Sequence, residues 1–264
     1  MRVDLEKAGR AVAGIVRAVG AFADKKGMAA FLVGGGVRDL LLKRMVKDVD
    51  IVVEGDAVRF ARELAADRGL PVKTHQQFGT AVISGWSSLC VDFVTARKEC
   101  YPFPGALPVV SRAGIRDDVF RRDFTINALA VVMNRGDFGT LVDLCGGVED
   151  LKKGRIRVFH ENSFLDDPTR ILRALRFEQR FGFRLVPGTR RLLARAVADR
   201  VEKTVSAPRY FQEFARGFWE EQPGQYLLRL KAIGALDFLG GDVLIEKGVL
   251  RFLDDQCARG EFSK

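Results

Sequence analysis

The chain has 264 residues, of which 47% are hydrophobic, so it has enough material for one large globular domain or two modest ones. Its formal charge of +9 and isoelectric point of about 9.6 favour a polyanionic partner, with a solvated basic surface as the alternative explanation. No apolar run approaches the roughly 18 residues that cross a bilayer, and the mixed-charge first segment is unlike a signal peptide, so we expect a soluble, cytoplasmic protein without membrane contact.

The spacing of cysteines and histidines argues against a zinc site and against disulfides. The four cysteines share no CxxC spacing, and neither histidine lies near them in the sequence. These residues are Cys90, Cys100, Cys145, Cys257, His75 and His160. Because neither histidine has an evident acid–base partner, we expect both to be structural or surface residues.

The first hundred residues alternate between helical and extended patterns. Apolar residues recur at intervals of three and four from Leu5 to Phe22, which predicts an amphipathic helix that ends near Gly27. The patterns that follow predict a strand at 29–33, a helix at 37–44, a strand at 48–53, a helix at 56–68, and strands at 80–85 and 89–96.

The second part of the chain changes from mixed patterns to helical ones. We expect a long irregular stretch from Arg97 to Asp118, which contains three prolines and would either contact substrate or cover the sheet. Residues 124–133 and 140–144 predict a β-hairpin that is entered from a helical segment. From about Phe164 onward only helical patterns occur, with expected helices at 167–181, 189–201 and 225–239. The sequence therefore predicts a mixed α/β front half and an all-helical rear half, divided between residues 155 and 163.

Two aspartates in one predicted strand suggest a metal site. Residues two apart in a strand project from the same face, so Asp48 and Asp50 would point together, away from the apolar Val49. Two such carboxylates can share Mg²⁺, which takes oxygen ligands and leaves positions for substrate phosphates. Asp92, in another predicted strand, is the candidate third carboxylate. Taken alone, a DxD pair is more often an ordinary solvent-facing pair.

Three glycines before the acids suggest contact with a phosphate. Gly34, Gly35 and Gly36 follow a predicted strand, and glycines allow backbone amides to approach a phosphate closely, although they also make ordinary tight turns. The stretch is neither GxGxxG nor GxxxxGK[ST], which argues against the Rossmann and P-loop folds.

These stretches and three later ones occur in one order that resembles the class II tRNA nucleotidyltransferase and bacterial poly(A) polymerase family. The matching stretches are "GGGVRD", "DVD", "RRDFTINALA" at 121–130, "DLCGGVEDL" at 143–151 and "DDPTRILRALRF" at 166–177. They cover most of the first 180 residues, and each is several residues long. The resemblance implies a nucleotidyltransferase head of the polymerase β type at residues 1–158 and a helical neck and body at 159–264.

The resemblance also implies an activity, which is the template-independent addition of AMP, CMP or both to an RNA 3′ end, most plausibly that of tRNA. ATP and CTP would be the substrates and two Mg²⁺ ions the cofactors, with Asp48 and Asp50 as the metal-binding pair and Asp92 as the third carboxylate. By position in the motifs, the nucleotide contacts would be Gly35, Arg38, Arg122, Asp167, Arg170, Arg173 and Arg176. Asp123 and Asn127 would either hold the ribose or brace the site.

Base selection follows from hydrogen-bond chemistry. Adenine and cytosine each offer an exocyclic amine donor beside a ring-nitrogen acceptor, so a carboxylate and an arginine accept both and disfavour uracil and guanine. Asp167 and Arg170, three residues apart on a predicted helix, have this chemistry, although a helix-terminal acid beside a surface arginine is the alternative. The sequence departs from the family in two ways. Asp166 occupies a position where family members usually have glutamate. The chain is also shorter than many members, so part of the helical region that binds RNA would be missing or supplied by another molecule.

Three other functions remain open at this point. They are poly(A) addition to general RNA, nucleotidyl transfer to a small molecule, and RNA binding without catalysis. The excess positive charge argues against the small molecule, and the intact acids argue against a silent protein. The basic helix at 189–201 could follow an RNA backbone or be an ordinary amphipathic helix. The sequence indicates no oligomeric state.

Overall fold

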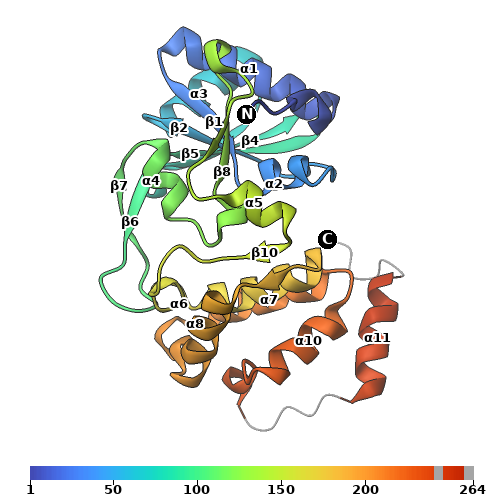
Figure 1. Cartoon of the computed structure of the whole chain (residues 1–264). Helices are drawn as coiled ribbons and strands as arrows, with labels where there is room; N and C mark the ends of the chain where they lie inside the picture. The colour runs from blue at the N-terminus through green and yellow to red at the C-terminus, as the bar shows by residue number, and fades with distance from the viewer. Residues whose placement is uncertain (241–245, 259–264) are drawn as a thin grey trace. The chain divides into compact units, whose positions relative to one another are not determined.

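The computed structural model describes residues 1–240 and 246–258, and within the last helix it describes only some of the side chains (Figure 1). The chain forms two compact units. The first comprises Met1–Cys100 and Val110–Leu151, and the second comprises Tyr101–Val109 and Lys152–Lys264. The division expected after residue 158 therefore falls inside the second unit, and the proline-containing stretch 101–109 packs with the second unit.

A seven-stranded sheet forms the framework of the first unit, in the order β3-β4-β5-β2-β1-β8-β9. Its strands are β1 (Ala29–Val33), β2 (Val49–Glu54), β3 (Val72–His75), β4 (Thr80–Trp86), β5 (Leu89–Thr95), β8 (Leu129–Val132) and β9 (Leu141–Asp143). β2 and β5 pair in parallel, whereas the other neighbours are antiparallel. The expected strands and the β8–β9 hairpin are confirmed. β3 was not predicted, because its side chains alternate between exposed and half-buried and carry no apolar repeat.

The two faces of this sheet are covered differently. Helices α1 (Arg10–Lys26) and α3 (Ala57–Arg68) cover one face, where Phe22 and Phe60 pack edge to face and Phe60 meets Phe93 of β5 (Figure 1). On the other face Phe31, Val33 and Val52 form a cluster against which Ile115 packs. Side chains two apart in a strand share a face, so Asp50 lies on the face of Val52, opposite α1 and α3.

The other helices of the first unit differ in detail from the expected ones. They are α2 (Gly35–Leu41), α4 (Ile115–Phe120), α5 (Gly147–Lys152) and the 3₁₀ turns η1 (Leu5–Ala8), η2 (Gln76–Phe78), η3 (Thr125–Asn127) and η4 (Arg135–Asp137). The predicted helix from Leu5 is interrupted at Gly9, whose φ of 94° cannot belong to an α-helix. The α1 and α3 ends are as expected, because Gly27 and Gly69 adopt the left-handed conformation that closes a helix.

The stretch from Arg97 to Asp118, expected to be irregular, contains regular structure. β6 (Arg97–Cys100) and β7 (Val109–Arg112) form a two-stranded sheet, and α4 begins directly after it. Every residue of β7 is exposed and β6 is largely charged, so neither strand shows the apolar alternation by which a strand is recognised in sequence.

The second unit is helical around a small core. Its helices are α6 (Ser163–Asp166), α7 (Thr169–Phe181), α8 (Pro187–Ala198), α9 (Ala207–Ala215), α10 (Pro223–Ala232) and α11 (Lys247–Ala258), with 3₁₀ turns η5 (Val201–Thr204), η6 (Arg216–Trp219) and η7 (Asp237–Leu239). Leu172 and Leu175 of α7 are fully buried, as expected. Phe214 packs edge to face against Phe218 and Phe238, which joins α9 to the segments that follow.

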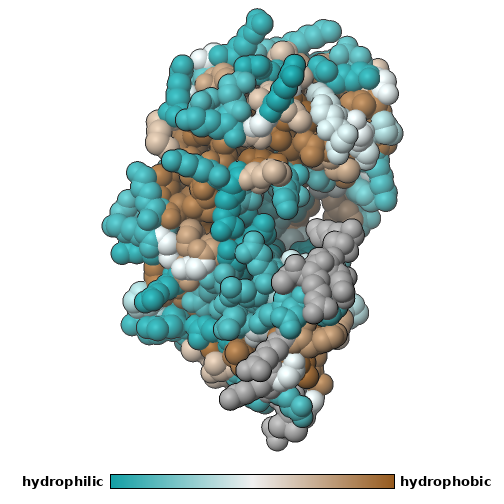
Figure 2. Space-filling model, turned by 90° about the vertical axis from the view of Figure 1, so that its right-hand side faces the viewer, coloured by the Kyte–Doolittle hydropathy of each residue, from teal (hydrophilic) through white to brown (hydrophobic). Residues whose placement is uncertain are grey.

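Two features of this unit depart from the all-helical expectation. β10 (Arg155–Ile156) and β11 (Arg184–Leu185) pair in parallel, and two-residue strands are too short to leave a sequence pattern. The helix expected at 225–239 ends earlier, because Gly234 adopts a φ of 74°. No helix in the described ranges has the length and apolar character to cross a membrane. The face drawn in Figure 2 is mainly hydrophilic with separate apolar patches.

Cys90, Cys100 and Cys145 are free thiols, and the side chain of Cys257 lies outside the described part of the chain.

Candidate active site

Three carboxylates of the first unit lie together on two parallel strands, two at the start of β2 and one in the middle of β5. Asp50 of β2 and Asp92 of β5 are register partners, and Asp48 directly precedes β2. Burial, followed by the charge of Asp92, raises the pKa of Asp50 to about 6, and the charge of Asp48 adds to this rise. Burial and the charge of Asp48 likewise raise the pKa of Asp92. The structure therefore brings the three predicted acids close enough for the charges of Asp92 and Asp48 to raise the pKa of Asp50.

The glycine turn lies against these acids because it has no side chains. Gly34, at φ 66° and ψ −130°, links β1 to α2 in a conformation that other residues rarely adopt. A methyl group on Gly34 would lie 2.9 Å from Nη1 of Arg122 and 3.8 Å from Oδ2 of Asp50. A methyl group on Gly36 would lie 3.0 Å from the carbonyl oxygen of Asp48. The turn, the acids and Arg122 thus share one small volume.

Arg122 is oriented by a buried acid that sequence reasoning missed. Its Nη2 donates to Oδ2 of Asp118 at 2.8 Å, while Arg121 donates to Oδ1 of the same carboxylate from Nε and Nη2, at 2.8 and 2.7 Å. Burial alone would raise the pKa of Asp118, but the two guanidinium groups hold it below its usual range. Nε of Arg122 is buried and has no hydrogen-bond partner among the described residues. An uncompensated buried donor is suited to an anionic oxygen.

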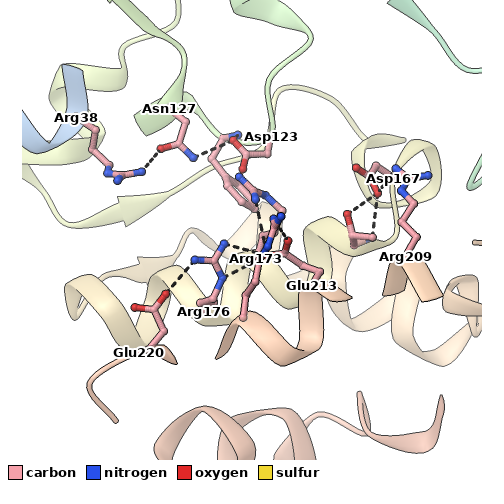
Figure 3. A network of polar contacts seen from close by, with 12 residues as sticks. Arg38, Asp123, Asn127, Asp167, Arg173, Arg176, Arg209, Glu213 and Glu220 are labelled. Atoms are coloured by element: carbon pink, nitrogen blue, oxygen red, sulfur yellow. Dashed lines mark hydrogen bonds and ion pairs between the residues drawn. The ribbon is translucent and has the colours of Figure 1, made fainter. Parts of the chain in front are cut away.

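Arg38 is held by a second chain of contacts, shown in Figure 3. It is 5% exposed, donates from Nη1 to Oδ1 of Asn127 at 2.6 Å, and pairs with Asp39. Asn127 in turn donates from Nδ2 to Oδ1 of Asp123 at 2.9 Å. Of the two roles left open for Asp123 and Asn127, these contacts favour bracing of the site.

These residues fit the groups that the resemblance implies. In the described ranges, no set of three or more His, Cys, Asp or Glu side chains is arranged to hold a metal ion by itself. Mg²⁺ in phosphoryl-transfer sites is usually bound by one or two carboxylates together with substrate phosphates and water. Asp48 and Asp50 supply such oxygen ligands, and a divalent cation would offset the negative charge gathered around Asp50. The assignment of Asp92 as a direct ligand stays a prediction.

The glycine turn allows a first test of this site. In Gly34→Ala the new methyl group would displace Arg122, so we expect the affinity for ATP to fall at least about tenfold, or roughly 1.4 kcal/mol. Isothermal titration with Mg²⁺-ATP measures this. Gly27→Ala is the control, since Gly27 has a φ of 63° but no atom within 4 Å of the added carbon. Equal ATP affinities in the two variants would contradict the close approach of Gly34 and Arg122 to the triphosphate.

The four remaining predicted residues belong to the second unit, where Asp167 is paired with a residue that was not predicted. Its Oδ1 accepts from the backbone N and Oγ1 of Thr169, at 3.1 and 2.6 Å, at the start of α7. The same oxygen lies 2.9 Å from Nη2 of Arg209, which also donates to the carbonyl of Gly105 (Figure 3). Asp167 is thus fixed by α7 and α9, with 18% of its side chain still exposed.

The three arginines of α7 have different surroundings. Arg170 is 4% exposed and donates to Oγ of Ser163 at 2.7 Å. Arg176 donates to Glu213 and to Glu220, both at 2.9 Å, and is 8% exposed (Figure 3). Arg173 lies 3.7 Å from Glu213 and over the ring of Phe177. These contacts do not support a triphosphate contact for Arg176, because both ends of its guanidinium group are already bound to buried or half-buried carboxylates.

Helical spacing was the available signal for one missed residue. Asp118 lies three residues before Arg121 and four before Arg122, which is the spacing of side chains that meet on a helix. The partners of Asp167 and Arg176 left no such signal, since they lie more than thirty residues away in the sequence.

Comparison with known proteins agrees with this geometry. Residues 30–157, which contain the acids, the glycine turn and Arg122, match the family model of the Poly A polymerase head domain. This segment of the chain belongs to the head-domain family. The matched residues run from β1 to the end of β10, and the resemblance carried by the sequence motifs is confirmed.

Curated relatives with the same head domain are tRNA nucleotidyltransferases. The A-adding tRNA nucleotidyltransferase of Geobacter sulfurreducens is 41% identical over 93% of this chain and 28% of its own length. That of Aquifex aeolicus is 51% identical over 64% of this chain and 20% of its length, and the CC-adding enzyme of Deinococcus radiodurans is 36% identical over 81% and 56%. A tRNA nucleotidyltransferase solved with a primer tRNA and an ATP analogue has a TM-score of 0.79 and 39% identity, over 88% of this chain and 65% of that one. The chain therefore spans less than two thirds of each of these relatives.

Proposed function

We propose that the protein is a template-independent nucleotidyltransferase that adds AMP, CMP or both to the 3′ end of tRNA. The observation that carries this proposal is the set of three carboxylates beside a glycine turn and the orphan donor of Arg122. The tRNA substrate is supported by the names of the relatives, and by the relative solved with tRNA and an ATP analogue. A-addition is the first activity to test, because the relatives that are 41% and 51% identical to this chain are A-adding enzymes. The cytoplasmic location stays a prediction from the sequence.

The reaction joins an RNA 3′-hydroxyl to the α-phosphate of a nucleoside triphosphate and releases pyrophosphate. Mg²⁺ held by Asp48 and Asp50 would lower the pKa of the attacking hydroxyl and stabilise the charge on the departing pyrophosphate. Arg122 would bind triphosphate oxygens through its fork of donors, with its orientation fixed by Asp118. Arg38, fixed by Asn127 and Asp39, would act in the same way from α2. Fixed donors stabilise developing charge without reorganising during the reaction.

Base selection is assigned to the start of α7. The carboxylate of Asp167 would accept from the exocyclic amine of adenine or cytosine, and Arg170 would donate to the neighbouring ring nitrogen. Arg209 contributes by holding Asp167 in place through the same oxygen that accepts from Thr169 at the start of α7. Arg176 has a positioning role here, since Glu213 and Glu220 bind it to α9 and to the segment after η6.

One assay tests the proposal against its alternatives. The protein is incubated with Mg²⁺, each labelled nucleoside triphosphate in turn, and tRNA that ends before, within or after CCA. We expect label on tRNA that lacks its terminal A, and the pattern over the three ends separates A, C and CCA addition from a poly(A) tail. Incorporation into no RNA would contradict the proposal and leave nucleotidyl transfer to a small molecule or RNA binding without catalysis.

Base selection has its own prediction. Asp167→Ala should relax discrimination against UTP and GTP by about tenfold or more, because it removes an acceptor that pairs with the amine of the correct base. Competition between labelled nucleotides on one tRNA measures the change. Asp166→Ala, the neighbouring acid, is the control. Unchanged nucleotide preference in Asp167→Ala would assign base selection to other residues.

A further inference from the structure

A cavity of about 770 Å³ lies within the second unit, and none of the residues assigned above to metal or nucleotide lines it. It is lined by two segments, residues 153–161 and 184–192. Four cations line it, Lys153, Arg155, Arg157 and Arg184, against the single acid Glu161. Its volume falls in the range of about 300 to 1,000 Å³ that is typical of small-ligand pockets. The cavity is therefore large enough for a nucleotide unit, and its lining includes more basic side chains than acidic ones.

Two of these cations are forced together by the fold. β10 and β11 pair in parallel with Arg155 opposite Arg184 and Ile156 opposite Leu185. Ile156 and Leu185 are buried, so the two arginines share the other side of this small sheet. Neighbouring strands lie only about 4.8 Å apart, and like charges at facing positions are destabilising.

No acid offsets this pair within the described ranges. Neither Arg155 nor Arg184 makes an ion pair or a side-chain hydrogen bond with another described residue. By contrast, Arg38, Arg121, Arg122, Arg176 and Arg209 all have a carboxylate within 3.1 Å. The fold thus maintains an uncompensated pair of guanidinium groups on the wall of an open cavity, with Arg155 half-buried and Arg184 exposed, and a bound anion would stabilise this arrangement.

The rest of the lining suits a phosphate. α8 begins here with Pro187, and its N-cap Val186 has no side chain that could accept from the first-turn amides. Gly188 and Thr189, in that first turn, line the cavity. Helix N-termini carry partial positive charge and backbone donors that favour phosphate groups.

We propose that this cavity, through Arg155 and Arg184, binds a backbone phosphate of the RNA substrate. Lys153 and Arg157 lie two residues to either side of Arg155, so the cations are spaced along the chain and suit consecutive phosphates better than one free nucleotide. The inference rests on the proposed function, because it takes RNA as the substrate.

The test compares two double variants by tRNA binding from 50 to 200 mM salt. Arg155→Ala with Arg184→Ala should weaken binding about tenfold, and should lower the slope of log affinity against log salt by about 1 to 2, since each phosphate contact contributes about 0.9. Arg190→Ala with Arg191→Ala is the matched control, because these exposed arginines lie on α8 but do not line the cavity. It should leave the slope within error of the parent protein. The melting temperature of the first variant should equal or exceed that of the parent, because a repulsive pair has been removed.

The outcomes are distinct. Equal losses in both double variants, or an unchanged slope in the first, would overturn the proposal and show only diffuse attraction. A loss of ATP affinity without a loss of tRNA affinity would assign the cavity to a free nucleotide, which also overturns it. A lower melting temperature in the first variant would contradict the claim that Arg155 and Arg184 repel each other, and the inference depends on that claim. Failure of the proposed function looks different, because then the parent protein itself neither binds nor extends tRNA.

Discussion

Asp50→Asn is expected to abolish nucleotide transfer while making the metal-free protein more stable. The transfer rate should fall at least about a thousandfold, or roughly 4 kcal/mol, because a neutral amide cannot replace a carboxylate that holds Mg²⁺. The stability gain follows from burial and from Asp92, which raise the pKa of Asp50 from 3.8 to about 6. This rise in pKa of about two units corresponds to at most roughly 3 kcal/mol. The folded parent protein is less stable by that amount at neutral pH, where Asp50 is charged, and Asp50→Asn removes this penalty.

The pH dependence of this gain has a definite sign. Because the folded protein holds the Asp50 proton more tightly than the unfolded chain, the parent loses stability as the pH rises from about 4 to about 6. The advantage of Asp50→Asn should therefore be absent below pH 4 and complete above pH 6, as measured by urea unfolding in EDTA. Mg²⁺ should stabilise the parent and not the variant. Asp67→Asn, an exposed change on α3, is the control. An active Asp50→Asn enzyme would refute the metal assignment.

Asp118→Asn should have the largest effect on stability. Asp118 is fully buried and binds both Arg121 and Arg122, so its neutralisation leaves two guanidinium groups without their shared carboxylate. Breaking a buried ion pair by removing one partner costs about 3 to 5 kcal/mol. The loss should appear in urea unfolding at pH 7, and ATP affinity should fall with it because Arg122 is no longer oriented.

Acid should reproduce this loss in the parent protein. The pKa of Asp118 lies below its usual range in the folded state, so its stabilising contribution is complete above about pH 4 and is lost as the pH falls further. Asp117→Asn, an exposed neighbour on the same helix, should change the unfolding free energy by less than about 0.5 kcal/mol. Equal effects of the two substitutions would show that the buried ion pair does not stabilise the fold.

The parts of the site that sequence could predict are those encoded locally. Gly34 to Gly36, Asp48 and Asp50 lie within one strand–helix–strand segment, β1–α2–β2, where the apolar alternation of β2 fixes which side chains share a face. The position of Asp92 in a strand was predicted for the same reason, because Asp92 lies between Val91 and Phe93, whose side chains are buried on the other face.

The parts that sequence could not predict depend on tertiary partners. The basic face of α7 was expected to contact the nucleotide, but Glu213 and Glu220 bind Arg176 from 37 and 44 residues away. Arg209 reaches Asp167 across a similar separation. A helical pattern reports that one face is polar, and it does not report whether acids from another helix neutralise that face. The short strands β10 and β11 escaped notice because two residues carry no periodicity.

The order of the site residues along the chain bears on how the site is assembled during synthesis. Asp48, Asp50 and Asp92 leave the ribosome before Asp118, Arg121 and Arg122. Until β8 pairs with β1 and residues 118–127 settle beside the glycine turn, the nascent sheet gathers negative charge without the guanidinium group of Arg122 to oppose it. The site that we propose for a triphosphate is therefore complete only after the segment that carries Arg122 and β8 has been made.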